Sequence, residues 1–134
     1  MPDPKNETLT IGSSSDVVMV RQAVRTAAAG LGFSLVDQTK IVTAASELAR
    51  NTFEHGGGGT ARLEIVTQGI RRGIRLTFED KGPGISDLTL ALKDGYTTGG
   101  GMGLGLSGSR RLVNEFDIAS KAGEGTRVTV TKWK

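Results

Sequence analysis

The clustering of glycine constrains this chain more than any other feature of its sequence. The chain has 20 glycines in 134 residues, and most of them stand in tight groups rather than singly. The richest stretch runs from residue 80 to residue 105 and holds few large apolar side chains. A loop of that length inside a compact domain costs conformational order without burying apolar surface, so it usually serves a function. We therefore expect a functional site along this stretch.

The spacing of apolar residues between the glycine groups predicts three helices and about five strands. Helical spacing recurs over about 16–31, 37–53 and 104–116, and Asp16 is the expected N-cap of the first helix. Alternating patterns predict strands over 7–11, 61–65, 74–78, 118–121 and 126–132. Most strands follow one another as antiparallel hairpins. We therefore expect one α+β domain over residues 1–134, a two-layer α/β sandwich whose mixed, mainly antiparallel sheet carries helices on one face.

The composition excludes several classes of function. Seventeen basic and fourteen acidic residues leave a net charge of +3 without a long basic run, so we expect no nucleic-acid partner. The absence of cysteine rules out disulfides, thiolate metal sites and cysteine nucleophiles. No apolar stretch approaches the roughly 20 residues that span a bilayer, and the first residues lack the apolar core of a signal peptide. We expect a cytoplasmic protein without a membrane partner.

The first candidate cluster lies on the second predicted helix. Glu47 and Asn51 are four residues apart, so they share one helix face one turn apart. A carboxylate and an amide oxygen are hard ligands that Mg²⁺ accepts, especially beside phosphates. Either group could instead orient a hydroxyl or a water, and taken alone the pair also fits a polar helix face with nothing bound.

The second cluster follows the strand predicted at 74–78. Asp80 stands at the strand end, where its carboxylate can accept a hydrogen bond from an amino group such as that of adenine. Gly82 and Gly84 let the backbone turn sharply and approach a ligand closely. The alternative is a tight turn with an ordinary surface Asp.

The third cluster is the glycine-rich run at 99–105, which leads into the third predicted helix. Free backbone N–H groups and the positive end of a helix dipole suit a phosphate. The run is not a Walker A loop, because no Gly-Lys-Ser/Thr follows, and it does not open a dinucleotide-binding βαβ unit. Alone, such a loop is only moderately specific.

Taken in order, these clusters resemble the GHKL superfamily of ATPases, which includes gyrase B, Hsp90, the histidine kinases and MutL. The resemblance covers about residues 35–130, and a Gly-Glu-Gly-Thr turn that ends at Thr126 completes it. It implies the GHKL (Bergerat) sandwich fold with ATP and Mg²⁺ as cofactors. On the base side, Asp80 would bind the adenine amino group and Gly82 and Gly84 would pass beneath the ring. Thr126 would support this site through a water.

The resemblance also implies roles around the phosphates. Asn51 would bind the Mg²⁺ that bridges them, and Glu47 would be the candidate general base. Residues 85 to about 102 would form the ATP lid. The backbone N–H groups at the end of the glycine run would contact the phosphates at Gly101, Gly103, Leu104 and Gly105.

Within the superfamily, four segments and the closing Lys-Trp-Lys resemble the RsbT type of serine/threonine switch kinases. These segments span residues 46–51, 79–85, 94–100 and 122–126. The resemblance implies phosphorylation of a Ser or Thr on an STAS-domain antagonist or scaffold of the RsbS or RsbR type. It also implies subsequent activation of a PP2C-type phosphatase of the RsbU type.

Three other readings of the sequence stay open. The chain could be an anti-sigma kinase of the RsbW or SpoIIAB type that sequesters a sigma factor, or an ATP-gated binding module with little turnover. A histidine kinase fragment is the weakest of the three, because nothing here could dimerise as its helical hairpin does. No group of potential metal ligands surrounds His55 in the sequence, so we expect this residue at the surface or packed on a glycine loop.

Overall fold

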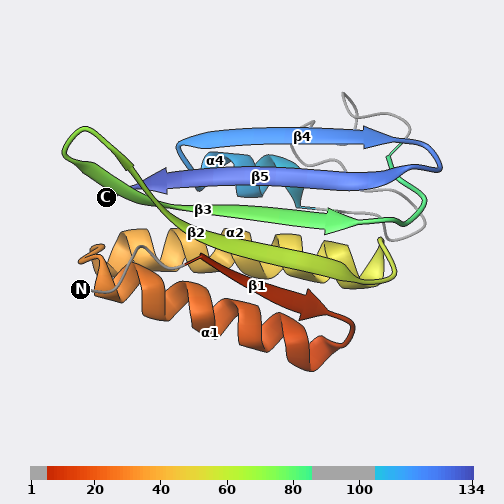
Figure 1. Cartoon of the computed structure of the whole chain (residues 1–134), viewed down its shortest axis with the longest axis horizontal. Helices are drawn as coiled ribbons and strands as arrows, with labels where there is room; N and C mark the ends of the chain where they lie inside the picture. The colour runs from red at the N-terminus through yellow and green to blue at the C-terminus, as the bar shows by residue number, and fades with distance from the viewer. Residues whose placement is uncertain (1–5, 86–104) are drawn as a thin grey trace.

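The computed structural model describes residues 6–85 and 105–134, which form a sheet layer and a helix layer (Figure 1). The elements follow the order β1 (Asn6–Ile11), α1 (Ser14–Gly30), α2 (Leu35–Glu54), β2 (Gly59–Gln68), β3 (Arg71–Asp80), α4 (Leu106–Arg111), β4 (Glu115–Lys121) and β5 (Gly125–Trp133). This arrangement confirms the expected α+β sandwich. Within the described ranges, no helix is both long and apolar enough to cross a membrane.

The five strands form one sheet in the order β1-β2-β3-β5-β4, and each pairing is antiparallel. The sequence predicts a mixed sheet, but the described part of the chain contains no parallel strand pair. The register aligns one apolar side chain from every strand across the helix-covered face, in the row Leu9, Ala61, Phe78, Val128 and Ile118. Because side chains alternate between faces, this row fixes which residues face the helices.

The two long helices begin earlier than the sequence pattern predicts. The N-cap of α1 is Ser13, whose hydroxyl accepts a hydrogen bond from the N–H of Asp16, so the prediction of Asp16 as the cap is wrong. Asp16 instead lies in the first turn, and its carboxylate accepts the N–H of Gly12 at 2.9 Å. Ser34 caps α2 in the same way. Serine competes with aspartate for the cap position, and an acidic residue in the first turn suits the helix dipole equally well.

The third helix is shorter than predicted. It ends at Arg111, and strand β4 already begins at Glu115. Phe116 and Ile118 therefore alternate along a strand and pair with Val130 and Val128 of β5. The apolar residues after Arg111 fit both a helical and a period-two pattern over so short a stretch, and pairing with β5 decides in favour of the strand.

The helices bury one stripe each against the sheet. The buried residues of α1 are Val20, Val24 and Ala28, and those of α2 include Ile41, Leu48 and Thr52. Figure 1 shows α2 running behind the strands along the length of the sheet. At one end of α2, the buried Lys132 lies 3.7 Å from the carboxylate of Asp37. The opposite end of α2 reaches the glycine groups.

Trp133 packs on the sheet face opposite the helices. Its indole N–H donates to Glu115 at 2.8 Å, and the Arg71 guanidinium lies 4.5 Å from its ring centroid. A Cβ added at Gly73 would lie 2.8 Å from the indole ring and 2.6 Å from the carbonyl oxygen of Lys132. Gly73 therefore leaves the space that the indole ring and the carbonyl oxygen of Lys132 occupy.

We expect Gly73→Ala to lower the free energy of unfolding by about 1–3 kcal/mol, because the added methyl group overpacks the contact with Trp133. Chemical denaturation measures the change. Gly30→Ala is the matched control, since a Cβ there meets nothing within 4 Å and helix propensity favours alanine. Equal stability of Gly73→Ala and the unchanged protein would show that the indole can move without cost.

Candidate functional site

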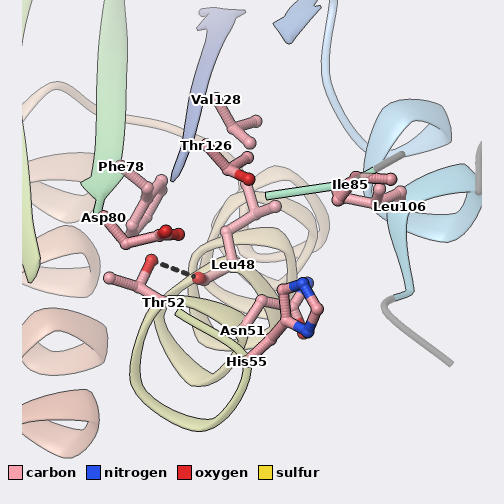
Figure 2. A pocket seen from close by; sticks show the side chains of 10 residues that line it. All are labelled: Leu48, Asn51, Thr52, His55, Phe78, Asp80, Ile85, Leu106, Thr126 and Val128. Atoms are coloured by element: carbon pink, nitrogen blue, oxygen red, sulfur yellow. Dashed lines mark hydrogen bonds between the residues drawn. The ribbon is translucent and has the colours of Figure 1, made fainter. Parts of the chain in front are cut away.

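A hollow opens at the end of the sheet where the glycine groups meet. It encloses about 320 Å³ of space, part of it open to solvent. Figure 2 shows the side chains around it. They come from α2 and the residue after it, from β3 and the segment after it, and from β5 and α4: Leu48, Asn51, Thr52, His55, Phe78, Asp80, Ile85, Leu106, Thr126 and Val128. The predicted residues Asn51, Asp80 and Thr126 are thus brought together around one pocket.

Register places the polar residues of this pocket in one row at the sheet edge. Asp80 of β3 pairs with Thr126 of β5, and Thr126 pairs with Ser120 of β4. The row directly beneath it is the apolar row of Phe78 and Val128. The pocket therefore has an apolar floor and a polar end wall, a combination that suits a flat heteroaromatic ring with a few polar groups.

Asp80 is held in position by backbone groups from two glycine segments. One carboxylate oxygen accepts the N–H of Gly82 at 2.9 Å. Gly56 lies against the same side chain, because a Cβ added there would stand 2.3 Å from the Asp80 Cγ. The aspartate therefore has its orientation set before any ligand binds.

The glycines around Asp80 are needed because backbones touch there. A Cβ at Gly82 would lie 2.6 Å from the carbonyl oxygen of Gly56, and one at Gly84 would lie 2.0 Å from that of Lys121. Gly125 has a φ of +86°, and a Cβ there would lie 2.2 Å from the carbonyl oxygen of Asp80. Gly82 and Gly84 therefore approach neighbouring backbone closely, and their approach to a ligand stays a prediction.

Ser120 joins this end wall from behind. Its hydroxyl accepts the N–H of Ile85 at 2.8 Å, donates to the carbonyl oxygen of Gly125 at 2.9 Å and lies 2.8 Å from the hydroxyl of Thr126. Thr126 thus has a protein partner in addition to the pocket it lines. No motif in the sequence marks Ser120 as a site residue.

The face of α2 carries the second half of the site. Glu47 is one-third exposed and forms an ion pair with Arg50. A Cβ added at Gly105, which caps α4 with a φ of +64°, would lie 2.7 Å from a carboxylate oxygen of Glu47. The end of the glycine-rich run therefore lies directly beside Glu47, one turn of α2 away from Asn51.

Several residues of the pocket carry no functional signal in the sequence. His55 lines it and lies 3.2 Å, through Nε2, from the carbonyl oxygen of Gly84, which confirms the expectation of packing on a glycine loop. Leu48, Phe78, Ile85, Leu106 and Val128 form its apolar lining, and a helix stripe or strand alternation alone marks them only as core. Gly101, Gly103 and Leu104, with most of the expected lid, lie outside the described residues.

The described residues fit a nucleotide with its cation. The apolar floor beside Asp80 suits a purine, and the Glu47–Asn51 face beside Gly105 offers oxygen ligands where phosphates would extend. No group of three or more His, Cys, Asp or Glu side chains that could hold a metal occurs in the ranges 6–85 and 105–134. A Mg²⁺ would therefore take most of its ligands from phosphates and water, as Mg²⁺ does in phosphoryl-transfer sites.

Comparison with known proteins agrees with this geometry. Residues 36–134 match the family model described as histidine kinase-, DNA gyrase B-, and HSP90-like ATPase. The chain is 46% identical over 118 residues to the serine/threonine-protein kinase RsbT of Bacillus subtilis, with 88% of this chain and 89% of that protein covered. It is 29% identical over 129 residues to an anti-sigma F factor of Thermoanaerobacter, with 92% and 89% covered.

Solved structures share the fold. The crystal structure of the RsbU and RsbW domains of a Mycobacterium tuberculosis protein matches 99% of this chain with a TM-score of 0.64 and 23% identity. The chain spans 33% of that longer protein. A histidine kinase domain from Erythrobacter litoralis matches 89% of this chain and 59% of its own, with a TM-score of 0.54 and 20% identity.

We expect Gly56→Ala to weaken ATP binding about ten- to a hundredfold, since the new methyl group displaces the Asp80 side chain and removes a charge-assisted hydrogen bond. Calorimetric titration measures the affinity. Gly108→Ala on α4 is the control, because a Cβ there meets nothing within 4 Å. A folded Gly56→Ala variant with unchanged affinity would remove Asp80 from the binding site.

Proposed function

We propose a function from one premise: the chain belongs to the family of histidine kinase-, DNA gyrase B- and HSP90-like ATPases, and within it to the RsbT-type serine/threonine-protein kinases. From this premise we infer that it transfers the γ-phosphoryl group of Mg-ATP to a Ser or Thr of an STAS-domain partner protein. The observation that carries the proposal is that Asn51, Asp80 and Thr126 line one pocket together, with Glu47 on the same helix as Asn51.

The polar end wall of the pocket suits adenine. The Asp80 carboxylate would accept a hydrogen bond from the exocyclic amino group, and the apolar side chains of Phe78 and Val128 would contact the ring. Because Gly82 and Gly56 already hold the carboxylate, little side-chain ordering accompanies binding. The base then directs the ribose and phosphates toward α2.

The phosphate end would use α2 and the start of α4. Asn51 would supply an oxygen ligand to Mg²⁺, which neutralises phosphate charge when bound. Gly105 adjoins the carboxylate of Glu47 without a side chain between them. Glu47 would orient the attacking hydroxyl of the partner protein and accept its proton, while Arg50 holds the carboxylate in place.

The partner assignment rests on the RsbT-type resemblance. The substrate would be an STAS-domain protein of the RsbS or RsbR type, and a PP2C-type phosphatase of the RsbU type would be the next partner. A phosphate on the substrate adds about −1.5 to −2 charges beside the phosphates of ADP, so the product would bind less well. Release would free the kinase for the phosphatase, and the cycle would run in the cytoplasm.

A second function has its own observation. The 29% identity to anti-sigma F factors over nearly the whole chain favours a protein that captures a sigma factor. In that case phosphoryl transfer would serve to release the captured factor. Co-purification with a sigma factor rather than with an STAS-domain protein distinguishes this alternative.

We expect Glu47→Gln to bind ATP nearly as the unchanged protein does but to transfer phosphate about 10²–10⁴-fold more slowly, since the amide cannot accept the hydroxyl proton. Single-turnover kinetics and calorimetry separate the two effects. Glu54→Gln is the control, because Glu54 is exposed at the end of the same helix. Full activity of Glu47→Gln would make Glu47 a structural residue.

We expect the chain, incubated with Mg-ATP and its cognate STAS-domain protein, to phosphorylate a Ser or Thr of that protein and not itself. Phosphate-affinity electrophoresis detects the product, and pull-down compares modified with unmodified partner. The unmodified partner should bind more tightly. Tight capture of a sigma factor without phosphorylation of any STAS-domain protein would contradict the switch-kinase proposal and support the anti-sigma alternative.

A further inference from the structure

The hydroxyl of Ser120 has three hydrogen-bond neighbours, and they leave one arrangement of protons that satisfies all three. The Ile85 N–H can only donate, so it uses one lone pair of the Ser120 oxygen. The Gly125 carbonyl can only accept, so it takes the single proton of Ser120. The hydroxyl of Thr126, 2.8 Å away, must then donate its own proton to Ser120.

This arrangement fixes what Thr126 offers to the pocket. Its proton points backward to Ser120, so its oxygen presents only lone pairs on the pocket side. Figure 2 shows this oxygen above Leu48, and the strand register places Thr126 beside Asp80 in the end wall of the pocket. An ionised carboxylate also accepts only. The end wall of the pocket therefore presents acceptors from both β3 and β5.

Two acceptors select a ligand group with hydrogens to donate. An amino group at position 6 of a purine carries two N–H bonds, whereas an oxo group at that position carries none. The oxo group would place a third acceptor against the Asp80 carboxylate and the Thr126 oxygen. These buried polar atoms would then lack hydrogen-bond donors, which lowers the affinity. A free Thr126 hydroxyl, in contrast, could rotate and donate to an oxo group.

We propose that Ser120 is a positioning residue that sets the selectivity of the pocket for 6-aminopurine over 6-oxopurine nucleotides by holding the proton of Thr126 away from the ligand. Ser120 itself does not line the pocket. The inference rests on the proposed function, because it assumes that the pocket binds the base of a nucleotide. It assigns selectivity to a serine on the edge strand β4, behind the residues that contact the base.

The test compares ATP with ITP, which carries an oxo group at position 6 and a hydrogen on N1, where ATP has an amino group and an unprotonated N1. We expect Ser120→Ala to lower the ratio of ATP to ITP affinity about three- to tenfold, the equivalent of one neutral hydrogen bond. Ser120→Thr retains the hydroxyl and should keep the ratio. Thr126→Val removes the responding hydroxyl, so adding Ser120→Ala to it should leave the ratio of that variant unchanged.

A structural role alone would not produce this pattern, because lost stability lowers the affinity for both nucleotides together. An unchanged ratio in folded Ser120→Ala would overturn the inference, as would an equal effect of Ser120→Ala with and without Thr126. If Ser120→Ala does not fold, Ser120→Cys carries the same test, since a thiol is a weak donor and acceptor. Failure of the unchanged protein to bind ATP would overturn the proposed function itself.

Discussion

Contact between backbones at one end of the sheet is the constraint on which the rest of the site depends. The turn after α2, the turn after β3 and the start of β5 meet around Asp80 so closely that Gly56, Gly82 and Gly125 leave no space for a Cβ. This contact aligns Asp80 with Thr126 and positions the end of α2 over the apolar floor. A side chain at any of these three positions would separate segments that the pocket needs in contact.

Much of the fold could be predicted from periodicity, because the long elements carry unambiguous patterns. The strands around Leu63 and Leu76 and the helix around Leu48 lie where alternation and helical spacing place them. The short third helix was overestimated because Phe116 satisfies both periods until its partner Val130 is known. The cap of α1 was misplaced because Ser13 and Asp16 both suit a helix start, and only the hydrogen bond separates them.

The site was predictable to the extent that its residues stand in a recognisable order. Asn51, Asp80 and Thr126 line the same pocket, as the family resemblance requires. The roles of Gly56 and Ser120 could not be predicted from the sequence, because they arise from strand register and from contacts across the fold, which no local spacing reveals. Gly56 appears in the sequence only as a helix stop, and Ser120 appears only as one more residue of an edge strand.

The position of β5 within the sheet has a consequence for the order of assembly. This strand follows all the others along the chain, yet it lies between β3 and β4 and supplies Thr126. Until β5 emerges from the ribosome and inserts, β3 keeps an unpaired edge, and β4 has no neighbour in the sheet. Pairings between strands that are distant in sequence form late, and until they form the unpaired strand edges are prone to aggregation. Nucleotide binding therefore cannot assist the nascent chain before synthesis has passed Thr126.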